Sequence, residues 1–335
     1  MNSSFLAKLE ILADSGHKLR FPSHGLGSIL ANILDKNLLG ASNQFPDPPR
    51  GRTLVIVGDF GGNHRRQHFD TYSFLLLDLD RNAGWLNAQR RFRRAILPNA
   101  RRMSFKAMND NQRRRALVPF LQTASEIDGC LVQFAISKAG GSLFNGASEV
   151  DEPSSLLSMW KPRVQERLLR IVHLSAFLVS GLSVPNQDLL WIIDEDDIAA
   201  NDNQLTQLTK VFGTVFSNYA SHGLRHIRCG TTRSDSGSLW LEDLAAIADL
   251  ATGTLGEVCT GFIDQSRFPR RGLIVPAPTG LTWKARLITS WMAAQDRQLR
   301  RHTSVIELAP NSSKTRVTTV GWNAFEGQIV LPRSG

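Results

Sequence analysis

The chain has 335 residues, of which 42% are apolar and 21% charged, and its formal net charge is +9. That length is sufficient for one large domain, or for two domains, with a sizeable core. No apolar run approaches the roughly 20 residues that span a bilayer, and the first residues lack the basic start and apolar block of a secretion signal. The three cysteines form no CxxC pair, which favours buried thiols over disulfides or a zinc cluster. We therefore expect a cytoplasmic protein without a membrane segment.

Strand-like and helical stretches alternate along most of the chain, which is typical of an α/β fold. Residues 1–50 come first and predict two short amphipathic helices, at 5–13 and 28–39, before a proline-containing loop. Strands are then expected at 53–58, 71–77, 102–106, 130–136, 189–193 and 225–229, the first two as a hairpin with a long basic loop. Helices are expected at 85–96, 111–125, 161–178, 204–221 and 238–255.

The pattern changes beyond Gly261, where a proline-rich link leads into a helix at 283–298 and two strand-like pieces at 304–308 and 316–320. The expected organisation is therefore a helical segment at 1–50, a central domain at 51–262 and an α+β extension at 263–335. The two terminal segments are candidates for docking onto a protein partner or a second copy of the chain.

Basic residues concentrate between Arg50 and Arg115, where fourteen Arg and one Lys face five Asp. Guanidinium groups bind phosphate oxygens in a bidentate fork, so this clustering suits a nucleic-acid backbone. The candidate nucleic-acid-binding residues are Arg65, Arg66, Arg90, Arg94, Arg102, Lys106, Arg113 and Arg114, with Trp85 as a candidate base-stacking residue. The alternatives are a solvated basic face and a surface for an acidic protein.

Three carboxylates stand out by their position. Asp59 follows the first strand, Asp194 ends the buried run at 189–193, and Asp243 shares a helix face with Trp240 and Ile247. An ionised carboxylate on an apolar face is costly unless it is paired, protonated or bound to a cation. Clustered acids suit Mg²⁺ or Mn²⁺. Asp59 as a turn residue, Asp194 as a helix cap and Asp243 as the partner of a buried arginine remain as alternatives.

The order of these motifs resembles the domain of unknown function 3800 family, whose members are assigned a ribonuclease H-like fold. The resemblance covers about residues 52–258 and lies in four places: Gly58-Asp59-Phe60-Gly61, Ser104-Phe105-Lys106, Leu190-Trp191-Ile192-Ile193-Asp194 and Leu239-Trp240-Leu241-Glu242-Asp243-Leu244-Ala245-Ala246. It implies a mixed sheet flanked by helices, with the terminal segments as appendages. It also implies a connection with phage defence or mobile elements.

Carried over residue by residue, the resemblance makes Asp59, Asp194 and Asp243 the catalytic, metal-binding acids. In ribonuclease H-like enzymes such acids hold two divalent metals, one activating the attacking water and the other stabilising the leaving oxygen. The implied function is a Mg²⁺- or Mn²⁺-dependent nuclease that hydrolyses phosphodiester bonds.

One departure from the family pattern bears on that activity. Ser104 stands where the family has a glutamate, and Phe60 replaces a second one. Glu242 is a candidate replacement ligand, as are Glu195 and Asp196. Without such a replacement, the chain is a degenerate ribonuclease H-like module that binds nucleic acid or a protein partner without cutting.

Overall fold

A computed structural model describes residues 51–62, 67–140, 156–193, 197–235, 237–265, 274–275, 278–294, 298–308 and 315–322. The strands are β1 (Thr53–Gly61), β2 (Phe69–Asp78), β3 (Gly129–Ser137), β4 (Asp188–Ile193), β5 (His226–Thr231), β6 (Ile274–Val275), β7 (Leu299–Leu308), β8 (Thr315–Thr319) and β9 (Gly321–Trp322). The α-helices are α2 (Ala83–Ala95), α3 (Asn111–Ala124), α4 (Pro162–Leu182), α5 (Asp202–Tyr219), α6 (Trp240–Asp264) and α7 (Trp283–Ala293). None of the helices found in these ranges is long and apolar enough to cross a membrane.

A seven-stranded mixed sheet forms the centre of the described structure, in the order β5-β4-β1-β2-β3-β7-β8. β2 is antiparallel to both β1 and β3, whereas β4 is parallel to β1 and to β5. The register pairs Gly58 of β1 with Ile193 of β4 and Asp59 of β1 with Ser73 of β2. The expected α/β fold with a mixed sheet flanked by helices is confirmed.

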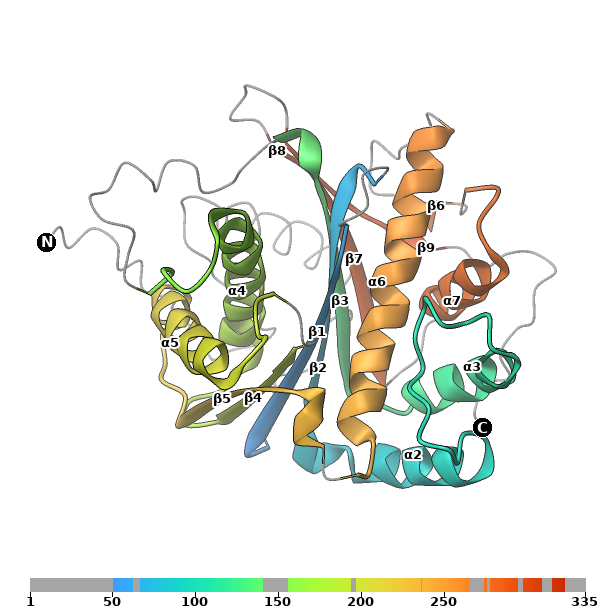
Figure 1. Ribbon diagram of the computed structural model, residues 1–335, viewed down its shortest axis with the longest axis horizontal. Coiled ribbons are helices and arrows are strands. Elements are labelled where there is room, and N and C mark those ends of the chain that lie inside the picture. Colours follow the sequence, from blue (N-terminus) through green and yellow to red (C-terminus); the bar gives the residue numbers. More distant parts are fainter. Residues whose placement is uncertain are drawn as a thin grey trace, which may run out of the picture.

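Helices cover both faces of this sheet (Figure 1). On one face α4 and α5 pack over alternate strand residues such as Leu54 and Ile56. On the other face α2, α3, α6 and α7 pack over the intervening residues, among them Val55 and Val57. Because side chains alternate along a strand, one run of apolar residues supplies both cores.

Most of the expected elements are present, with changed ends. The expected strand at 102–106 is wrong, because these residues form irregular backbone and a turn between α2 and α3. Asp59 lies within β1, which continues to Gly61. The expected helices at 5–13 and 28–39 fall outside the described residues.

The C-terminal strands complete the central sheet. β7 pairs in parallel with β3, and β8 pairs with β7. β7 and β8, which lie in the expected 263–335 extension, are therefore strands of the same sheet as β1.

Candidate functional site

Asp59 lies on the face of the sheet that α6 covers. Its side chain is two and four residues beyond those of Val57 and Val55, so it faces the same side. Asp59 is half-buried, and its backbone oxygen accepts a hydrogen bond from Thr252 Oγ1 of α6 at 3.0 Å. The middle of α6 therefore crosses the sheet at Asp59.

Asp243 lies in the first turns of the same helix and is fully buried. Arg93 of α2 donates to both of its carboxylate oxygens, with Nε at 2.8 Å from Oδ2. Gln89 Nε2 donates to Oδ2 at 2.7 Å and also to the Ser238 backbone oxygen at 3.1 Å. Burial raises the pKa of the Asp243 carboxyl, while the Arg93 guanidinium acts in the opposite direction. Asp243 is therefore the partner of a buried arginine, which is one of the alternatives that the sequence allowed for it.

The helix itself separates Asp59 from Asp243. Asp243 is nine residues before Thr252, the residue that contacts Asp59, and this corresponds to roughly 13 Å of helix rise. Oxygen ligands of Mg²⁺ lie about 2 Å from the ion. Since the Asp243 carboxylate also points to α2, it does not fit a metal ion shared with Asp59.

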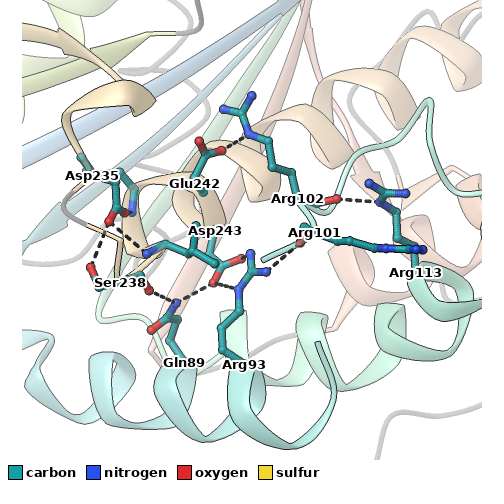
Figure 2. Close-up of polar contacts among 11 residues, drawn as sticks. Gln89, Arg93, Arg101, Arg102, Arg113, Asp235, Ser238, Glu242 and Asp243 are labelled. Atoms are coloured by element: carbon teal, nitrogen blue, oxygen red, sulfur yellow. Dashed lines mark hydrogen bonds and ion pairs between the residues drawn. The ribbon is translucent and has the colours of Figure 1, made fainter. Parts of the chain in front are cut away.

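The other candidate ligands have different positions. Arg102 Nε donates to the Glu242 carboxylate (Figure 2). The Arg102 guanidinium also donates to Thr232 Oγ1. Asp194, Glu195 and Asp196 fall outside the described residues. The described ranges hold no cluster of three or more His, Cys, Asp or Glu side chains that could bind a metal ion.

Ser104, at the position of the family's glutamate, lies in the irregular segment between α2 and α3. The next residue, Phe105, donates its backbone N–H to Asp249 of α6 at 2.6 Å. The segment around Ser104 is therefore anchored to α6 through a carboxylate that the sequence analysis did not select.

The positive charge of the molecule is concentrated in the stretch from α2 to α3. Residues 83–124 contain nine Arg and one Lys against one Asp, a net charge of +9. The exposed cations of this stretch are Arg90, Arg91, Arg94, Arg101, Arg102, Lys106, Arg114 and Arg115, and with the half-buried Arg113 they are called the arginine surface below. Both α2 and α3 lack acidic residues.

Several of these cations have no carboxylate partner among the described residues. In those ranges no ion pair involves Arg90, Arg91, Arg94, Lys106 or Arg115. Arg101 and Arg113, by contrast, share the carboxylate of Asp110. Arg90, Arg91 and Arg94 of α2 are thus available to an external anion, because no carboxylate among the described residues pairs with them and they are exposed.

The segment that joins α2 to α3 is held by two arginine side chains. Arg93 Nη1 donates to the Arg101 backbone oxygen and Arg113 Nε to that of Arg102, each over 2.7 Å (Figure 2). The two helices also pack directly, with the Phe92 and Phe120 ring centroids 5.6 Å apart. The cations of the arginine surface therefore lie on two packed helices and on a joining segment that is hydrogen-bonded to both.

The structure divides the predicted nucleic-acid-binding residues into three groups. Arg90, Arg94, Arg102, Lys106 and Arg114 are exposed, Arg113 is half-buried, and Arg65 and Arg66 lie outside the described residues. The expected stacking role of Trp85 is wrong, because this side chain is only 2% exposed and packs in the core beneath α2.

Three exposed arginines of this surface are not among the binding residues predicted from the sequence, namely Arg91, Arg101 and Arg115. Helical periodicity distinguishes Arg91 from its buried neighbour Arg93. Arg93 is four residues beyond Gln89 and eight beyond Trp85, so it lies on their buried face, whereas Arg91 does not.

The chain matches no protein-family model and no curated protein. The resemblance to the domain of unknown function 3800 family therefore remains a prediction from the four short motifs.

Proposed function

We propose that the chain binds nucleic acid through the arginine surface and that this binding needs no divalent metal. The observation that carries the proposal is the net charge of +9 over residues 83–124, with guanidinium groups exposed on α2, on α3 and between them. Arginine forks match phosphate oxygens, and release of counterions from the polymer drives such binding.

A ribonuclease H-like fold is part of this proposal. The strand order β3-β2-β1-β4-β5, in which β2 alone runs against the other four, supports it. The engagement of Asp243 by Arg93, together with Ser104 in place of an acid, supports a module that has lost the metal-binding set. In this proposal the fold is a scaffold that presents cations.

The test is fluorescence anisotropy with labelled oligonucleotides in a chelating buffer. The variant Arg90→Gln/Arg91→Gln/Arg94→Gln removes three exposed charges from α2 and keeps the helix propensity. Its matched control is Lys161→Gln/Arg163→Gln/Lys210→Gln, which removes three exposed charges near α4 and α5, on the opposite face.

We expect the wild type and the control to bind in the absence of metal, with an affinity that falls steeply between 50 and 200 mM salt. The α2 variant is expected to lose most of this affinity. Equal binding by the α2 variant and the control would reject the arginine surface as the binding site.

A metal-dependent nuclease remains the second candidate, and one observation favours it. The parallel strands β1 and β4 are neighbours, and the residue before Asp59 pairs with Ile193, the residue before Asp194 in the chain. Cleavage of the same oligonucleotides in Mg²⁺ or Mn²⁺ that disappears in both Asp59→Asn and Asp194→Asn would establish this activity.

A further inference from the structure

The arginine surface offers cations to a ligand, whereas the aromatic rings near it are in contact with other parts of the protein. Trp85 lies in the core under α2. The Arg114 guanidinium lies 4.9 Å from the centroid of the Trp283 ring, and the Lys284 ammonium lies 4.1 Å from that of Phe105. Proteins that hold single strands commonly stack the bases on open aromatic rings. Here each of the two half-buried rings already has a cation of the protein over one face.

We infer that the partner of the arginine surface is double-stranded nucleic acid, bound through its phosphates. This inference rests on the proposed function. A duplex carries one charge per about 1.7 Å of its axis, twice the linear density of one of its strands. A surface whose contribution is charge alone therefore binds the duplex more tightly than a single strand of the same sequence.

The hydrogen bonds that hold the segment between α2 and α3 point to the same partner. Main-chain oxygens of Arg101 and Arg102 are held by Arg93 and Arg113, so the segment that carries these arginines is fixed before any ligand arrives. A duplex presents its phosphates in a fixed array, whereas a single strand loses conformational freedom when it is held by a rigid surface. Binding of a stiff duplex to prearranged cations therefore has a lower entropic cost than binding of a flexible single strand.

The experiment compares one labelled strand alone with its DNA duplex and with the matching RNA duplex, in a chelating buffer and over a series of salt concentrations. We expect at least one of the two duplexes to bind more tightly than the single strand. For that duplex, the slope of log affinity against log salt is expected to shrink by about 3 in Arg90→Gln/Arg91→Gln/Arg94→Gln, about one per lost phosphate contact. The Lys161→Gln/Arg163→Gln/Lys210→Gln control should keep the wild-type slope.

The outcomes separate this inference from the function on which it rests. A single strand that binds as tightly as both duplexes, with the loss of affinity still specific to the α2 variant, overturns the duplex inference and leaves the proposed function in place. Failure of all three polymers to bind at low salt overturns both. Duplex binding with an unchanged slope in the α2 variant assigns the duplex to a different surface, and it also overturns the inference.

Discussion

Arg93 and Asp243 form an ion pair that is buried between α2 and α6. The two side chains are 8% and 1% exposed, although 150 residues separate them in the sequence. The same guanidinium reaches the Arg101 backbone oxygen, so one residue fixes α2 on α6 and orients the segment that follows α2. The pair therefore positions the arginine surface relative to the sheet.

Removing one member of this pair is expected to be much more costly than removing both. Asp243→Leu leaves a buried guanidinium without its carboxylate, and Arg93→Leu leaves a buried carboxylate, so each should lower the free energy of unfolding by about 3–5 kcal/mol. The double variant Arg93→Leu/Asp243→Leu should lose far less than the sum of the two. Urea denaturation of all four proteins measures the coupling, and strictly additive losses would contradict the ion pair.

Divalent cations are expected to leave this pair undisturbed. A ligand that binds only the native state raises its stability in proportion to RT ln(1 + [L]/Kd). Because Arg93 and Gln89 occupy the Asp243 carboxylate, Mg²⁺ should change the unfolding temperature of the wild type and of Asp243→Leu by the same amount. A rise that is present in the wild type and absent in Asp243→Leu would show that Asp243 binds the ion.

Two helical glycines are expected to respond in opposite ways to alanine. A Cβ at Gly253 of α6 would lie 2.4 Å from Cγ of Phe105, whereas a Cβ at Gly213 of α5 meets no atom within 4 Å. Gly253→Ala should therefore cost about 1–3 kcal/mol of unfolding free energy, since the segment around Phe105 must move. Gly213→Ala should add about 0.5–1 kcal/mol through helix propensity. Chemical denaturation distinguishes the two, and a stabilised Gly253→Ala would mean that Phe105 does not dock on α6.

Acid is expected to weaken the fold through the buried His302 and the half-buried His173. Burial lowers the pKa of His302 and of His173 to about 4, whereas an unfolded chain has a histidine pKa near 6.5. Between these values the unfolded chain takes up protons that the folded chain does not. Stability that is present above about pH 6.5 is therefore lost as the pH falls towards 4, by up to roughly 3 kcal/mol for His302.

Urea denaturation of the wild type and of His302→Gln over this pH range tests the effect. The variant should show a smaller loss of stability on acidification than the wild type. The exposed His68→Gln serves as the control and should follow the wild type. An identical pH profile for all three proteins would exclude His302 as a source of the acid sensitivity.

The expected elements came from local patterns and are mostly present, because backbone geometry imposes the periods that reveal them. A continuous apolar run predicted β4, and helical spacing predicted α2, in which the structure buries Trp85 and Phe92. The turn around Phe105 was mistaken for a strand. Its conformation depends on contacts with Asp249 and Lys284, which are far away in the sequence.

The candidate site was predictable only in part. The spacing of Asp243 with Trp240 and Ile247 places it on an apolar helix face, where the structure buries it. An acid in that position must be paired, protonated or bound to a cation, so the sequence predicted that its charge is compensated. The choice between a metal ion and an arginine depended on which element packs beside the start of α6. No local pattern contains that information.

The sequence by itself determined the alternation of strands and helices, the two apolar faces of the central strands and the concentration of positive charge before residue 116, because each is a property of neighbouring residues. Tertiary structure alone decided that Arg93 pairs with Asp243, and that roughly 13 Å of helix separates Asp243 from the contact with Asp59. The physical reason is that a charged side chain takes its role from the groups that packing places within hydrogen-bonding distance of it, and packing joins residues that are remote in the chain.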